Sequence, residues 1–177
     1  TVSILMRDQA GAVKTDNEVA VLNGQPVAVN EIVVLISGEK RKNGEAANVI
    51  IRGTTPEALV MRPEVRLVKG RVPAAGTSEV MAGISVAKNF KGCGLGERVH
   101  FAQRDWEVVG LFDSGGRSFD SELWGDVDQV QQAFRRPIYS SIPVRLKDPA
   151  RFSGKRLGGG VVLSVAAFAY SLWAIAG

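Results

Sequence analysis

Asp120, Glu122, Asp126 and Asp128 form the only dense group of carboxylates in this 177-residue sequence. Clustered carboxylate oxygens can bind calcium or magnesium, and a hydrolase could use such a metal. The spacing differs from that of an EF-hand loop, and Asp126 precedes a predicted helix whose free amides its side chain can cap. We therefore expect loop and cap carboxylates, with a metal-dependent hydrolase as an alternative.

The single histidine and the single cysteine give little further chemistry. One imidazole excludes zinc motifs that need two histidines, and one thiol excludes an internal disulfide. His100 alternates with Val99 and Phe101, which predicts a surface or edge position on a strand. Cys93 lies in a glycine-rich loop and would be reactive only if its pKa were lowered.

Three short motifs resemble functional signatures but lack required residues. Gly154-Lys155 has neither the first glycine nor the final Ser or Thr of a phosphate-binding loop. Residues 92–96 lack the third glycine of a dinucleotide fingerprint and lead into a predicted strand. Ser85 lacks the second glycine of a nucleophile elbow. We assign no catalytic, cofactor-binding or metal-binding residue, and we expect that the protein is not an enzyme.

The charge distribution argues against nucleic-acid binding. The net charge is +4, but residues 1–150 contain 19 cations and 18 anions. A nucleic-acid-binding surface needs clustered basic residues with stacking aromatics. Lys40, Arg41 and Lys42 form a short basic run in a turn, for which we expect a solvated hairpin end, with an acidic lipid or partner as the alternative.

The pattern of apolar residues predicts an α+β domain of short strands and hairpins with one or two short helices. The residues 32–36 and 48–52 read as two strands of a hairpin, with Asn43-Gly44 in its turn. A helix starts at Asp126, where Gln129 completes a capping-box pattern. Further strands are predicted at 65–68, 79–82, 98–101, 106–112 and 141–146, and a short helix at 85–90.

The C-terminal residues 157–177 contain no charged side chain, and Lys155 and Arg156 precede them. A membrane-spanning helix needs about 20 mostly apolar residues, so this segment is long enough to span a bilayer. A buried core helix and a non-native tail are the alternatives. The chain begins at Thr1 without a signal peptide as written, which a fragment explains most simply.

An ordered series of phrases carries a family resemblance. They lie at residues 48–53, 62–63, 68–71, 79–83, 94–96, 106–112, 119–126 and 139–141. The series resembles the MacB-like periplasmic core domain of ABC-transporter permeases in the FtsX-like family, over residues 29–152. This division makes residues 1–28 the start of the extracytoplasmic region and 153–177 an apolar C-terminal segment.

The resemblance implies a permease subunit of the cell (inner) membrane, with residues 29–152 facing the periplasm or cell exterior. Such a domain sits between the first two transmembrane helices, and its partners are a cytoplasmic ATP-binding subunit, a second permease and a periplasmic adaptor or substrate. It relays ATPase-driven motion and has no catalytic residues. Trp124 is then a core position. A stand-alone soluble binding module is the alternative, with 157–177 as its core helix.

The family continues beyond Phe152, where the match to this sequence fades. The positive-inside tendency would place Lys155 and Arg156 in the cytoplasm, whereas the resemblance places the domain just before them outside. Residues 157–177 are therefore either a transmembrane helix or an altered end of the chain.

Overall fold

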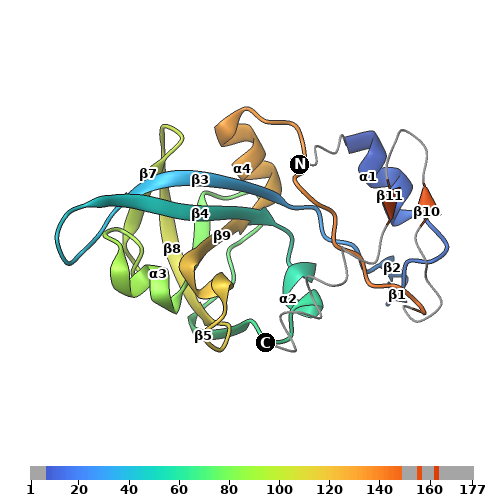
Figure 1. Ribbon diagram of the computed structural model, residues 1–177, viewed down its shortest axis with the longest axis horizontal. Helices are drawn as coiled ribbons and strands as arrows, with labels where there is room; N and C mark the ends of the chain where they lie inside the picture. The colour runs from blue at the N-terminus through green and yellow to red at the C-terminus, as the bar shows by residue number, and fades with distance from the viewer. Residues whose placement is uncertain (1–6, 149–154, 157–161, 164–177) are drawn as a thin grey trace.

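The computed structural model describes residues 7–148, 155–156 and 162–163. Its main element is a mixed seven-stranded sheet in the order β3-β4-β9-β6-β8-β5, with β7 paired to β8 (Figure 1). The strands are β3 (Ile32–Glu39), β4 (Ala46–Thr54), β5 (Arg66–Gly70), β6 (Glu79–Gly83), β7 (Arg98–Phe101), β8 (Arg104–Asp113) and β9 (Glu122–Asp126).

Four short α-helices and one 3₁₀ turn accompany the sheet in the described residues. They are α1 (Arg7–Lys14), α2 (Glu57–Met61), α3 (Ile84–Asn89), η1 (Ser118–Ser121) and α4 (Val127–Phe134). Two small ribbons complete the structure, β1 (Val21–Leu22) with β2 (Gln25–Pro26), and β10 (Lys155–Arg156) with β11 (Val162–Leu163). The predicted α+β fold class is confirmed.

Two apolar clusters lie on opposite faces of the sheet. One contains Ile51, Leu123 and Trp106 and is covered by α4, whose contacts are mainly with β4 and β9. The other contains Met81, Phe112 and Trp124 together with residues of α2 and η1. A register shift between β6 and β8 at Val80/Met81 leaves Val108 with the first cluster and Phe112 with the second. A bulged strand can thus supply both cores.

The β3–β4 hairpin confirms the sequence prediction for residues 32–36 and 48–52. Its eight paired positions run from Ile32 opposite Gly53 to Glu39 opposite Ala46. Alternation of buried and exposed side chains along β3 put Ile32 and Val34 on the α4 side and left Leu35 at the surface. The predicted strands at 65–68, 79–82, 98–101 and 106–112 are also confirmed, with slightly different limits.

The predicted strand at 141–146 is wrong. These residues form three isolated bridges, Glu31 with Ser141, Ala28 with Val144 and Val19 with Leu146. They pair with a separate incoming stretch of chain, and Pro143, which has no N–H group to donate, interrupts the ladder. Residues 19–31 and 139–147 therefore run antiparallel beside the sheet; we call them the incoming and the outgoing segment.

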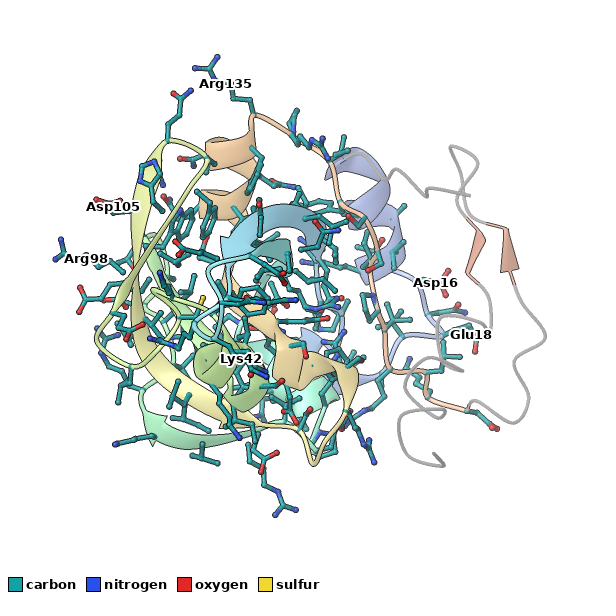
Figure 2. The ribbon with its side chains drawn as sticks, turned by 60° about the vertical axis from the view of Figure 1, so that its left-hand side comes forward. Asp16, Glu18, Lys42, Arg98, Asp105 and Arg135 are labelled. Atoms are coloured by element: carbon teal, nitrogen blue, oxygen red, sulfur yellow. The ribbon has the colours of Figure 1, made fainter. Side chains whose placement is uncertain are left out.

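A small lobe lies at one end of the molecule, beside the sheet (Figure 1). It consists of α1, the β1–β2 hairpin and the incoming and outgoing segments, and Ala10 and Val13 of α1 are buried in it. Figure 2 shows Asp16 and Glu18 on this lobe, on the opposite side of the molecule from Asp105. Helix α1 was not predicted, because its eight residues include Gly11 and only a short apolar stripe.

At the N-terminus of α4, one of the two hydrogen bonds of the predicted capping box is present. The Asp126 carboxylate accepts a hydrogen bond from the Gln129 backbone N–H at 3.0 Å, which confirms the cap. The Gln129 side chain does not return to Asp126; its oxygen accepts from Arg104 Nη1 at 2.9 Å. The reciprocal capping box is therefore wrong. Gly76 N–H also donates to Asp126, at 3.3 Å.

Replacing Asp126 with Ala should destabilise the domain by about 1 kcal/mol, because one amide of α4 loses its cap. Asp126→Asn keeps an acceptor at the same place and should cost much less. Urea unfolding followed by circular dichroism measures both variants. Equal destabilisation by the two substitutions would show that the carboxylate charge, and not the cap, is what matters.

Candidate functional site

Four charged side chains meet in the interior beside the sheet. Glu31 precedes β3, Arg52 lies in β4, Arg62 follows α2, and Glu122 begins β9. Arg52 donates to both Glu122 oxygens, at 2.7 and 2.8 Å, and to Glu31 Oε2 at 2.9 Å. Arg62 Nη2 donates to the same Glu31 oxygen at 3.0 Å, and its Nη1 lies 2.8 Å from Glu31 Oε1. We call these four residues the ion network.

Strand register explains why the ion network forms where it does. Arg52 pairs with Trp124 across the parallel β4–β9 ladder, so both side chains project to the same face. The indole Nε1 of Trp124 donates to Glu122 Oε2 at 2.7 Å. The guanidinium of Arg52 lies 5.4 Å from the Phe119 ring centre, and that of Arg62 lies 5.2 Å from it. Aromatic rings thus shield both cations from water.

Burial strengthens the attraction between the charges of the ion network and makes the loss of any one of them costly. The Glu31 side chain is 1% exposed, and that of Arg52 is 13% exposed. Burial alone would lower the pKa of Arg52, but the hydrogen bond to Glu122 and the attraction of Glu31 and Glu122 outweigh it and raise that pKa. Two cations and two anions balance, so the cluster is neutral as a whole. Removing one member would leave an uncompensated buried charge.

Glu31 also connects the two segments of the lobe through its backbone. Its carbonyl accepts from Ser140 N–H at 2.7 Å, and its N–H donates to the Ser141 carbonyl at 3.0 Å. Farther along, Val29 N–H donates to Pro143 O and Arg145 N–H donates to Val27 O, each at 2.9 Å. The incoming and outgoing segments are therefore paired with each other, and the Glu31 side chain joins that pair to the sheet.

The four carboxylates singled out in the sequence do not converge on a metal. Asp120 accepts from Ser114 N–H at 2.6 Å, Ser114 Oγ at 2.8 Å and Gly116 N–H at 2.9 Å. Glu122 belongs to the ion network, Asp126 caps α4, and Asp128 is exposed in the first turn of that helix. Among the described residues no three His, Cys, Asp or Glu side chains are placed to hold a metal ion. The hydrolase alternative therefore finds no site in this group.

The other candidate residues occupy separate positions. Cys93 is 2% exposed, and burial raises the pKa of its thiol to about 11, so it is protonated at neutral pH. His100 lies on β7, exposed as predicted, with Nδ1 2.6 Å from Asp105 Oδ1. The Ser85 hydroxyl accepts from the Asn89 side chain within α3. Gly154 lies outside the described residues, and its neighbour Lys155 is in β10.

The turn after β3 is less basic than its sequence indicates. Arg41 forms an ion pair with Glu97 at 2.5 Å, and Lys40 lies 3.8 Å from Glu45. Lys42 is exposed at the tip (Figure 2). Two of the three cations thus face an acidic partner within the domain, which supports the solvated hairpin end and weakens the alternative of a docking site for an acidic lipid.

A second charged contact fixes the loop between β5 and β6. Arg71 donates to both oxygens of Glu79, at 2.7 and 2.6 Å, and Ala74 N–H donates to the same carboxylate at 2.9 Å. Beside this loop is a small pocket of about 40 Å³ that Leu59, Pro73 and Trp124 help to line. Its volume admits only a few water-sized groups, so it is too small to serve as a substrate site.

A family model described as "MacB-like periplasmic core domain" matches residues 2–153. The chain belongs to this family. The predicted resemblance is therefore confirmed. Trp124, expected to be a core position, is 1% exposed. No curated protein matches the sequence significantly.

Solved structures show the same fold as the MacB-like domain. The extracellular domain of the noncanonical ABC-type transporter YknZ from Gram-positive bacteria has a TM-score of 0.61 at 16% identity, over 82% of this chain and 74% of that one. The periplasmic region of MacB from Actinobacillus actinomycetemcomitans gives 0.58 and 16%, over 81% and 65%. A domain assigned to a Porphyromonas gingivalis permease protein gives 0.52 and 17%, over 78% and 66%.

The MacB-like domain corresponds to only part of two of these structures, and its described residues include no membrane-spanning helix. The MacB-like domain spans just under two thirds of the MacB and P. gingivalis structures. Among its described residues, no helix has the length and apolar character required to cross a membrane. The predicted span at 157–177 lies outside the described residues, apart from Val162 and Leu163 in β11.

Sequence reasoning missed the ion network of the MacB-like domain, although a signal for it was present. Arg52 directly follows the apolar run of residues 49–51, and Glu31 directly precedes the run of 32–36. Val33 pairs with Arg52 in the hairpin, and Glu31 comes two residues before Val33. Residues two apart in an extended chain point to the same side, so the opposite charges of Glu31 and Arg52 lie diagonally opposite each other. The contribution of Arg62 from α2 had no comparable signal, since it depends on how the chain returns under the sheet.

Replacing Glu31 with Gln should destabilise the domain by about 3–5 kcal/mol, because Arg62 would lose its carboxylate partner and Arg52 would keep only Glu122. Glu45→Gln, which removes the exposed pair with Lys40, should change stability little. Chemical denaturation with matched m-values measures both. A small effect of Glu31→Gln would contradict the assignment of an essential buried charge.

The contact between Arg71 and Glu79 predicts a pH effect. Hydrogen bonds from Arg71 and then from the Ala74 N–H lower the pKa of Glu79 to about 2, from an ordinary value of 4.5. A lowered folded-state pKa stabilises the fold above the unfolded value and loses that contribution as the pH falls toward 2. Carboxyl NMR should find the Glu79 midpoint near 2 and higher in Arg71→Gln. An unchanged midpoint in that variant would contradict the contact, and Arg66→Gln is the control.

Proposed function

We propose that this domain is the extracytoplasmic part of an ABC-transporter permease subunit and relays ATP-driven motion mechanically, without catalysis of its own. The observation that carries the proposal is the attachment of two paired chain segments to the sheet, by the buried Glu31 side chain and by apolar side chains of both segments that pack in the first cluster with Ile32 and Val34. A domain that relays motion needs firm connections to the segments through which it is driven. The family of extracytoplasmic domains to which the chain belongs supports the same function.

The connection can bear load because several contacts must break together before the lobe separates from the sheet. Each backbone hydrogen bond contributes roughly 1 kcal/mol of net stability. Breaking a buried ion pair by removal of one partner costs about 3–5 kcal/mol more. Val33 N–H also donates to the Ser140 hydroxyl at 3.0 Å, so that β3 itself holds the outgoing segment. Movement of either segment should therefore move the sheet with it.

The remaining parts of the proposal concern partners and location. The motion would come from a cytoplasmic ATP-binding subunit, with a second permease beside this one in the cell (inner) membrane. Residues 29–152 would face the periplasm or cell exterior, and the sheet would contact a substrate or a periplasmic adaptor. The division into residues 1–28, 29–152 and 153–177 belongs to this proposal. The family description and the fold of the solved extracytoplasmic domains support the location outside the cytoplasm.

The test uses the permease that contains this domain, reconstituted in proteoliposomes with its ATPase. A fluorescent probe at Leu35→Cys, on the exposed side of β3, reports movement of the sheet. Cys93 is buried and protonated, so it does not compete for the label. Addition of ATP should change the probe's emission in the otherwise unaltered protein.

Glu31→Gln should uncouple the two processes: ATP hydrolysis continues and the probe response falls. Glu45→Gln, combined with the same probe, should behave as the unaltered protein does. If Glu31→Gln does not fold, Ser140→Ala, which removes only the hydrogen bond to Val33, gives a milder version of the same test. A full response in both variants would overturn the proposed relay.

A further inference from the structure

The β1–β2 hairpin exposes two aliphatic side chains at its tip. Val21 is 57% exposed and Leu22 is 50% exposed. Asn23 and Gly24 form a tight turn directly after them, both with left-handed backbone conformations at φ 51° and 77°. A two-residue turn of this kind holds the hairpin in a defined shape. The exposed pair is therefore presented on a fixed projection of the lobe.

The hairpin lies within a stretch that has no charge. Residues 19–30 contain no Asp, Glu, Lys, Arg or His, which makes this the longest such stretch within residues 7–148. At its base the backbone is paired with the outgoing segment: Glu18 O accepts from Lys147 N–H at 2.9 Å, and Ala20 N–H donates to Arg145 O at 2.7 Å. An uncharged apolar tip fits a neutral apolar surface better than it fits an acidic or basic protein partner.

The position of the hairpin indicates which apolar surface is near. Figure 1 shows the hairpin, α1, β10 and β11 at the same end of the molecule. The charge-free run 157–177 begins nine residues after Asp148, which directly follows the outgoing segment, so the chain between them spans at most about 30 Å. The part of the sequence with the composition of a bilayer-inserted segment therefore starts close to this lobe.

We propose that the β1–β2 hairpin contacts the lipid bilayer, with Val21 and Leu22 inserted at the boundary between headgroups and acyl chains. The inference rests on the proposed function, which makes the domain part of a membrane permease. Interfacial amphipathic helices bury their apolar face about 5–10 Å deep at this boundary, and the same burial of apolar area would drive insertion of the hairpin tip. Because the tip is uncharged, the contact should depend little on anionic lipid or on salt.

The experiment measures lipid contact at the hairpin in the full chain. A fluorescent probe is placed at Leu22→Cys, and a matched control carries the probe at Leu35→Cys, which replaces a side chain that is 63% exposed on β3. A C-terminal histidine tag holds either protein on phosphatidylcholine vesicles that contain a nickel-chelating lipid. This tether places the domain at the bilayer whether or not the relay function is correct.

Two quenchers distinguish the possible surroundings of the probe. A doxyl-labelled phosphatidylcholine should reduce emission at position 22 by about twofold or more, and emission at position 35 much less. Aqueous iodide should show the reverse order. Replacing part of the phosphatidylcholine with phosphatidylglycerol should leave the pattern unchanged.

Three results would overturn the inference. The first is the absence of doxyl quenching at position 22, and the second is equal doxyl quenching at both positions. The third is protection from iodide without doxyl quenching, which would show that protein covers the tip, either the run 157–177 or a second copy. None of these results depends on ATP hydrolysis, so failure here is distinguishable from failure of the relay.

Discussion

A carboxylate that is almost wholly removed from water needs cations or hydrogen-bond donors of the protein to compensate its charge. Glu31 meets this requirement with two guanidinium groups, from Arg52 and Arg62, and with the hydroxyl of Thr54 at 3.3 Å. These partners come from two parts of the fold: β4 supplies Arg52 and Thr54, and the residue after α2 is Arg62. Each must be in place before the charge is compensated, so the ion network fixes several elements at once.

The topology of the sheet brings the members of the ion network together. Strand β9 lies between β4 and β6, parallel to the first and antiparallel to the second, although it comes last of the three in sequence. This position places Glu122 and Trp124 beside Arg52. With the indole and the Phe119 ring over the cations, the second apolar cluster and the ion network share one face of the sheet. Glu31 joins the lobe to this face, while apolar side chains of the lobe such as Val19 and Val144 pack in the first cluster, so both cores help to attach it.

The sequence predicted local structure better than it predicted long-range contacts. The β3–β4 hairpin and the cap of α4 follow from neighbouring residues, and each was predictable. The buried position of Trp124 was expected from the family resemblance. The pairing of residues 139–147 with 19–31 joins positions more than a hundred residues apart, and no local pattern encodes it. For the same reason Asp120 and Glu122 looked like one cluster, whereas the turn at Ser114 and the strand β4 draw them to separate partners.

The central claim is that the incoming and outgoing segments stay paired while the domain works. Ala28 and Val144 are opposite each other, and the hydrogen bonds on either side join Val27 to Arg145 and Val29 to Pro143. Such a non-hydrogen-bonded pair has the short Cα separation that suits a disulfide. In the permease carrying Ala28→Cys and Val144→Cys, closing this disulfide should leave the ATP-driven response of the domain intact. Loss of the response on oxidation, with recovery on reduction, would show that the segments must separate and would contradict the account.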